Sequence, residues 1–236
     1  MTDLDFGTAR APSKYGLGSM AFKRLFSRIL AISVVGLLLA ATAASAEPYR
    51  IVGFGDSLMA GYQLAPGQSF PEKLEAAMKA EGHDVVISNA GVSGDTTSAG
   101  LARLDWSIPD GTDLVILELG ANDMLRGVSP EVTEGNLTKM IERLQTREID
   151  ILLIGMMAAP NLGTEYAERF NAIYPDLARE YDLPLYAFFL EGVAANDALL
   201  LEDGMHPNAA GVEGIVERIL PLVEKLIDAD IRTNGS

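Results

Sequence analysis

Five short apolar segments, separated by longer segments of helical period, limit most strongly how this chain can fold. The apolar segments are predicted strands and cover residues 49–55, 83–90, 112–120, 149–157 and 183–189. The predicted helices cover residues 69–82, 97–107, 130–147, 165–182 and 208–229. Several of the strands are apolar at nearly every position, which is typical of parallel strands covered on both faces. The alternation therefore predicts one α/β domain, in which a parallel sheet of five strands lies between two layers of helices.

The N-terminal segment has a different pattern. Lysine and arginine residues precede an apolar stretch at 29–44, and small residues follow it at 44–46. This order is that of a secretory signal peptide. The stretch is shorter than the ~20 apolar residues that span a membrane, so we favour cleavage near Ala46 over an uncleaved anchor. We therefore predict a signal peptide at 1–46, with an alternative start at Met20, and a periplasmic or secreted domain at 47–236 without a stable membrane anchor.

Composition excludes several classes of partner and chemistry. The chain has no cysteine, so a thiol nucleophile, a disulfide framework and a thiolate zinc site are excluded. The predicted signal peptide contains five of the 18 Lys and Arg residues and two of the 33 Asp and Glu residues. The remaining 13 basic and 31 acidic residues give a formal net charge of −18. Such a chain is a poor candidate for binding nucleic acid, which requires a concentrated basic surface.

Polar and glycine-rich segments follow the predicted strands. They read GDS at 55–57, NAGVSGDTTSAG at 89–100, GANDMLRG at 120–127 and LEDGMHPNAAG at 201–211. In a parallel sheet, the loops that follow the carboxyl ends of the strands gather at one edge. We therefore expect Ser57 and His206 to meet there, although 149 positions separate them.

These residue types together are suited to acyl transfer. A serine hydroxyl such as that of Ser57 needs a base to take its proton, and His206 is the candidate base. Asp203 lies three residues before His206, so a turn brings its carboxylate to the imidazole and fixes the tautomer. The backbone N–H groups of Ser57 and Gly94 and the amide of Asn122 are candidate donors to an oxyanion.

Each of these residues also has a simpler interpretation. Ser57 is placed where a helix N-cap is expected, and His206 precedes a proline that can begin the last helix. Asp56 is expected to brace its loop by hydrogen bonds to backbone amides, and Asp123 to be a turn former. The other histidine, His83, stands at the opposite edge of the predicted sheet, so we expect no metal site.

Four segments in order resemble the sequence blocks of the SGNH (GDSL) hydrolase family. They are GFGDSL, SGDTT, GAND and DGMHPN. The similarity extends over residues 50–225 and is greatest to the branch of periplasmic acyl-CoA thioesterases, lysophospholipases and arylesterases. The resemblance implies a flavodoxin-like α/β/α fold with strand order 2-1-3-4-5. It also implies a triad of Ser57, Asp203 and His206, oxyanion donors at Ser57, Gly94 and Asn122, and no cofactor or metal.

Methionines gather near the predicted site. Five of the nine lie on or beside its loops: Met59, Met124, Met156, Met157 and Met205. They suit either a pocket for acyl chains of varied shape or gaps in the core, and the sequence leaves both open. Resemblance to the same branch implies that Asn161 and Leu162 line the acyl site. We predict Met124, Met157, Asn161 and Leu162 as substrate-binding residues.

The sequence therefore predicts a serine hydrolase that cleaves carboxylic esters or thioesters through an acyl-serine intermediate. Its partner is a small-molecule ester or thioester with an acyl or aryl group, and aryl esters, acyl-CoA and lysophospholipids all stay open. One alternative is a carbohydrate O-acetylesterase, which would favour aromatic platforms in the site. Another is a non-catalytic nucleotide-binding module, although the glycines at 53, 55 and 61 do not follow the G-x-G-x-x-G spacing.

Overall fold

The computed structural model describes residues 47–234, and the predicted signal peptide lies outside them. Its sheet is entirely parallel and has the order β2-β1-β3-β4-β5, as predicted. The strands are β1 (Tyr49–Gly55), β2 (Val85–Gly91), β3 (Leu114–Glu118), β4 (Asp150–Ile154) and β5 (Leu185–Tyr186). β1 and β3 lie inside the sheet, which explains why their residues are apolar without alternation.

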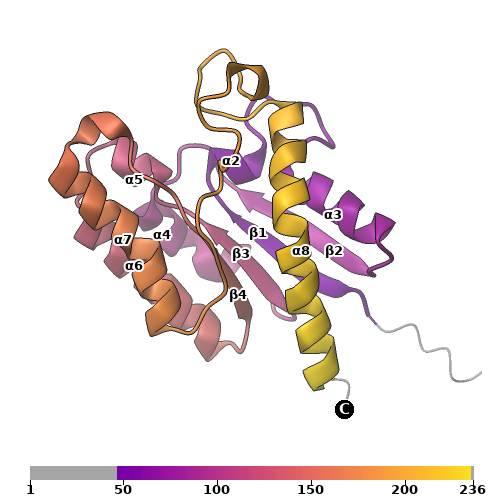
Figure 1. The fold of residues 1–236 in the computed structure, drawn as a ribbon. Coiled ribbons are helices and arrows are strands. Elements are labelled where there is room, and N and C mark those ends of the chain that lie inside the picture. The colour runs from indigo at the N-terminus through magenta and orange to yellow at the C-terminus, as the bar shows by residue number, and fades with distance from the viewer. Residues whose placement is uncertain (1–46, 235–236) are drawn as a thin grey trace, which may run out of the picture. The chain divides into compact units, whose positions relative to one another are not determined.

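Helices cover both faces of the sheet (Figure 1). One layer is formed by α3 (Phe70–Ala80) and α8 (Ala209–Asn234), which pack against each other. The other layer is formed by α4 (Thr97–Ser107), α6 (Pro130–Thr146) and α7 (Thr164–Glu180). Four short helices lie in the loops: α2 (Ser57–Ala60), α5 (Ala121–Leu125), η1 (Pro160–Leu162) and η2 (Asp197–Leu199). No helix within residues 47–234 is long and apolar enough to cross a membrane.

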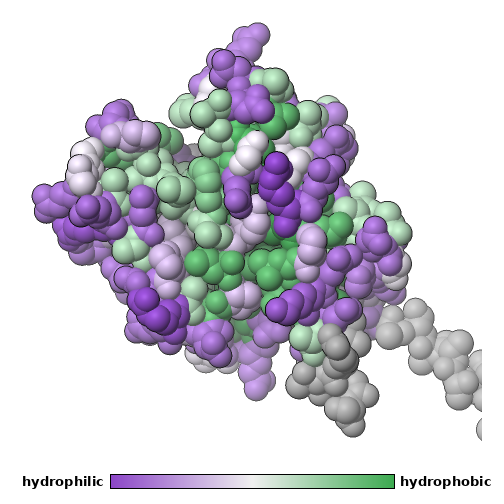
Figure 2. Space-filling view, viewed as in Figure 1, coloured by the Kyte–Doolittle hydropathy of each residue, from purple (hydrophilic) through white to green (hydrophobic). Residues whose placement is uncertain are grey.

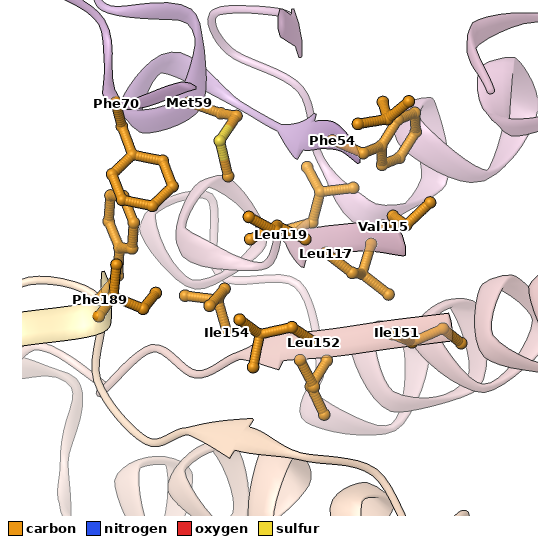
Figure 3. Close-up of a cluster of buried hydrophobic side chains, with 14 of the residues drawn as sticks. Phe54, Met59, Phe70, Val115, Leu117, Leu119, Ile151, Leu152, Ile154 and Phe189 are labelled. Atoms are coloured by element: carbon orange, nitrogen blue, oxygen red, sulfur yellow. The ribbon is translucent and has the colours of Figure 1, made fainter. Parts of the chain in front are cut away.

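The core lies between the sheet and the helices. Figure 3 shows side chains of β1, β3 and β4, among them Phe54, Leu117 and Leu152, which are fully buried. Phe70 of α3 meets Phe189 edge to face, with ring centroids 5.0 Å apart. Polar side chains predominate on the outer helices in the space-filling view, whereas hydrophobic residues gather toward its middle and its top (Figure 2).

The fifth strand is shorter than the predicted segment 183–189. Only Leu185 and Tyr186 pair with β4, at the edge of the sheet. The chain then leaves the ladder so that Phe189 reaches Phe70 in the core. Packing therefore ends this strand where the apolar pattern continues.

Arg103 of α4 ties two strand ends to the loop that follows β2. Its guanidinium group is almost buried, and it donates to the carbonyl oxygens of Ala90 (2.8 Å) and Gly55 (2.9 Å). It also pairs with Asp95 at 2.6 Å and lies 4.1 Å from the ring centre of Phe54. A single cation thereby holds β1, β2 and the 92–96 loop together at the carboxyl edge of the sheet.

We predict that Arg103→Ala lowers the free energy of unfolding by about 3–5 kcal/mol, because Asp95 is left almost buried without its partner. Arg143→Ala is the matched control, because the ion pair of Arg143 with Asp105 is exposed and is expected to contribute about 0–1 kcal/mol. Urea unfolding of both variants measures the difference. Equal losses in the two variants would contradict the role given to Arg103.

Candidate active site

Ser57 is the first residue of α2, at the point where β1 leaves the sheet. The N-cap of this helix is Asp56 and not Ser57, because the Asp56 carboxylate accepts a hydrogen bond from the N–H of Leu58 at 3.0 Å. The interpretation of Ser57 as a cap is therefore wrong, and Asp56 braces the turn as expected. The Ser57 hydroxyl is instead directed to His206, with 2.8 Å between Oγ and Nε2.

The loop before α8 brings His206 and Asp203 to Ser57. Nδ1 of His206 lies 2.7 Å from Oδ2 of Asp203. The other carboxylate oxygen of Asp203 accepts the backbone N–H groups of Met205 (2.9 Å) and His206 (3.0 Å). Leu201 donates to the carbonyl oxygen of His206 at 2.8 Å, which fixes the two sides of the loop to each other. The three residues of the predicted triad are thus brought together from opposite ends of the domain.

The charge of Asp203 sets the tautomer of His206. The backbone N–H of His206, followed by that of Met205, stabilises the carboxylate and lowers the pKa of Asp203 to about 2. Asp203 is therefore ionised at neutral pH and accepts the Nδ1 proton of the imidazole. Nε2 is left as an acceptor for the Ser57 hydroxyl, which is the arrangement that a general base requires.

The three predicted oxyanion donors line the same pocket. Ser57 begins α2, so its N–H is among those that a helix leaves without an internal acceptor. Gly94 has a φ of +88°, a conformation that other residues rarely adopt. One amide hydrogen of Asn122 is donated to Oδ2 of Asp56 at 2.8 Å, which leaves the second for a ligand. Asp56 therefore holds both Ser57 and Asn122 in place.

A pocket of about 830 Å³ opens beside Ser57. Met124, Met156, Met157 and Met205 are among its lining residues, whereas Met59 is fully buried in the core. The pocket interpretation therefore fits four of these methionines, and the core interpretation fits Met59. Asn161 and Leu162 are not among the residues that line this pocket, so their role in substrate binding stays a prediction. The wall after β4 is formed by residues 156–160, the last of which, Pro160, begins η1.

Comparison with known proteins identifies the family. The pattern of the GDSL-like Lipase/Acylhydrolase family matches residues 54–213, which contain all the site residues described above. The chain belongs to this family. The predicted resemblance is confirmed, and with it the expectation of a hydrolase that acts on ester bonds.

This GDSL-like hydrolase is similar to characterised and solved relatives. It is 40% identical over 177 residues to an arylesterase of Vibrio mimicus, covering 75% of this chain and 88% of the relative. It is 35% identical over 195 residues to the thioesterase 1/protease 1/lysophospholipase L1 of Escherichia coli K12, covering 82% and 91%. The crystal structure of AlinE4, an SGNH-hydrolase family esterase, is 49% identical, with 78% and 98% covered and a TM-score of 0.65.

A second carboxyl group lies behind the site of this GDSL-like hydrolase. Glu118, the last residue of β3, is buried, and its Oε2 accepts the N–H of Asp56 at 3.2 Å. Its Oε1 has no hydrogen-bond partner among residues 47–234. A Cβ at position 55 would lie 2.5 Å from Oε2, so the glycine of the GDS turn leaves room for this carboxyl group. The sequence pattern did not single out Glu118, because one polar residue within an apolar strand does not by itself indicate a function.

Burial of Glu118, followed by the nearby charge of Asp56, raises its pKa well above the ordinary value. Burial also raises the pKa of Asp56, but hydrogen bonds from Leu58 and Asn122 oppose that effect. Of these two carboxyl groups, Glu118 is therefore the one that is protonated, and Asp56 carries the negative charge. A neutral Glu118 avoids placing two carboxylates side by side in the protein interior.

Asp123 differs from its predicted role as a turn former. It is fully buried, and its carboxylate accepts both the N–H (2.7 Å) and the hydroxyl (2.6 Å) of Thr97. These bonds join α5, which carries Asn122, to the first turn of α4. The sequence gives a weak signal for this role, because a carboxylate in the first turn of one helix and a threonine at the start of another are both common.

We predict that Glu118→Gln becomes more stable relative to the natural chain as pH rises from 5 to 8. A group with a raised folded-state pKa contributes stability that is full below its unfolded pKa of about 4.3 and is lost as pH rises toward the folded value. Glutamine does not titrate, so Glu118→Gln has no such loss. The free energy of unfolding of the variant minus that of the natural chain therefore grows by at most about 1.4 kcal/mol per pH unit. Urea unfolding at several pH values measures it, and parallel stability curves would contradict a neutral Glu118.

Proposed function

We propose that this protein hydrolyses carboxylic esters through an acyl-serine intermediate, with Ser57, His206 and Asp203 as the catalytic triad. The observation that carries the proposal is the continuous chain of contacts from Ser57 Oγ to His206 Nε2 (2.8 Å) and from His206 Nδ1 to Asp203 Oδ2 (2.7 Å). The same arrangement of nucleophile, base and orienting carboxylate supports acyl transfer on several unrelated folds.

The proposed steps follow from these contacts. Ser57 Oγ attacks the ester carbonyl carbon while His206 Nε2 takes its proton, and the new oxyanion accepts hydrogen bonds from Ser57 N–H, Gly94 N–H and Asn122. The tetrahedral intermediate collapses, and His206 returns the proton to the departing alcohol. Water then attacks the acyl-serine, again giving its proton to His206, and the acid is released as Ser57 regains its hydrogen. These steps require no cofactor or metal.

The apolar pocket supports esters with an uncharged acyl or aryl part. Four methionines line it, and flexible thioether side chains adapt to acyl groups of different shape. The net charge of −18 after the proposed signal cleavage disfavours the polyanionic coenzyme A ester at long range. Trp106 does not line the pocket and is 76% exposed on α4. Tyr62 and Phe188 do line it, but most of the other lining side chains are aliphatic or thioether, which favours acyl or aryl groups over an acetylated sugar. We therefore propose neutral esters as better substrates than thioesters, lysophospholipids and acetylated carbohydrates.

We further propose that the protein is exported and acts in the periplasm or outside the cell, without a stable membrane anchor and without nucleic acid as a partner. The basic, apolar and small-residue segments of residues 1–46 support this location. The acidic composition supports the absence of a nucleic-acid partner. N-terminal sequencing of the exported protein should begin near Glu47.

We predict that Ser57→Ala reduces turnover of p-nitrophenyl butyrate by about three orders of magnitude or more, because the nucleophile is lost and only binding and the oxyanion donors remain. Labelling by a fluorophosphonate probe should be lost as well. Ser88→Ala is the control, because Ser88 is exposed on β2, away from the pocket. Full esterase activity in Ser57→Ala would refute the mechanism.

We predict that Met124→Ala shifts the preference among nitrophenyl esters toward longer acyl chains. Met124 Sδ accepts a hydrogen bond from the N–H of Ala159 at 3.1 Å, so its side chain reaches from α5 to the opposite loop of the pocket. Removal of the thioether lengthens the cavity between them. Relative kcat/KM values across chain lengths measure the shift, with Met78→Leu, in the core outside the pocket, as the control. An unchanged preference would remove Met124 from the pocket wall.

A further inference from the structure

The imidazole of His206 has an aromatic neighbour in addition to its two hydrogen-bond partners. The ring of Tyr62 lies against it, with centroids 4.5 Å apart and an angle of 37° between the planes. Ser57 holds one nitrogen of the imidazole and Asp203 holds the other, so Tyr62 limits the remaining freedom, which is tilting out of the ring plane.

Tyr62 is fixed to the same turn that carries Ser57. Its backbone N–H donates to the carbonyl oxygen of Ser57 at 3.1 Å. The preceding residue, Gly61, has a φ of +79°, and a Cβ there would lie 2.7 Å from Cβ of Ser69. Glycine at 61 therefore lets the chain turn sharply after α2 and places the Tyr62 ring against His206.

Core packing does not explain this position. Tyr62 is 38% exposed and lines the pocket beside Ser57. A large apolar ring that is this exposed contributes little to the core. Its closest aromatic contact is the imidazole that the proposed mechanism uses as a base.

We propose that Tyr62 is a positioning residue that stabilises the imidazolium form of His206 during turnover. The inference rests on the proposed function, in which Nε2 takes the Ser57 proton and the ring becomes positively charged. A cation within about 6 Å of an aromatic ring centre is attracted by the negative face of that ring. Tyr62 therefore stabilises the charged transition state while it keeps Nε2 directed at Ser57 Oγ.

Other charges near His206 stay constant when Tyr62 changes. They are the Asp203 carboxylate on the same loop and the buried Asp56 carboxylate at the start of α2, whose charge interacts with His206. Neither hydrogen-bonds to Tyr62. A change in the titration of His206 in a Tyr62 variant therefore reports the lost ring.

The test compares Tyr62→Leu with Tyr62→Phe. Leucine removes the aromatic face, and we expect kcat on p-nitrophenyl butyrate to fall by about 2- to 30-fold with little change in KM. The acid-side midpoint of kcat/KM should also move to lower pH, because the imidazolium loses stabilisation. Tyr62→Phe keeps the face and should recover most of the turnover and the midpoint. Trp106→Leu, an exposed aromatic on α4, is the matched control.

Nuclear magnetic resonance gives a second readout that does not depend on substrate. The chain has only two histidines, so His83 serves as an internal reference for His206. In Tyr62→Leu the titration midpoint of His206 should fall while that of His83, which faces Glu224 at 3.7 Å, stays unchanged. An unmoved His206 midpoint, or a loss confined to KM, would overturn the inference and leave Tyr62 only as a residue that lines the pocket. Absence of esterase activity in the natural chain would instead refute the proposed function.

Discussion

The parallel register between β1 and β3 is the constraint on which the site depends. Phe54 of β1 lies opposite Leu117 of β3, so the turn after β1 leaves the sheet next to Glu118. Hydrogen bonding between the Asp56 N–H and Glu118 then fixes the start of α2, where Ser57 stands. Because backbone ladders set this register, a shift by one residue would turn Asp56 and Glu118 away from each other.

A layer of buried polar groups connects the sheet to the pocket and fixes the position of the loops between them. Glu118 contacts Asp56, and Asp56 in turn holds the amide of Asn122. Arg103 supports the same edge from the other side through Asp95. Buried carboxyl and guanidinium groups cost free energy unless they are partnered, so these contacts favour the one arrangement of the loops in which the groups meet. Preorganised donors are what stabilise an oxyanion without rearrangement during the reaction.

Charge is distributed differently over the molecule and at the site. The chain is strongly acidic as a whole, yet the pocket beside Ser57 is lined mainly by apolar side chains. At the site the carboxylates are used locally, with Asp203 orienting an imidazole and Asp56 bracing a turn. Tyr62 adds an aromatic ring against the same imidazole, whose two nitrogens are held by Ser57 and Asp203.

The sequence by itself indicated the alternation of strands and helices, the four loops that follow the strands, and the candidate residues Ser57, Gly94, Asn122, Asp203 and His206, because periodicity and local motifs are properties of neighbouring residues. The strand order was implied by the family resemblance. The sequence did not determine the end of β5 or the pocket wall, where Asn161 and Leu162 were predicted and residues 156–160 are found. Nor did it reveal Glu118, Arg103 or Tyr62. Each of them has a contact with a segment 48 to 144 positions away, and only the packing of the folded chain decides which side chains meet across such distances.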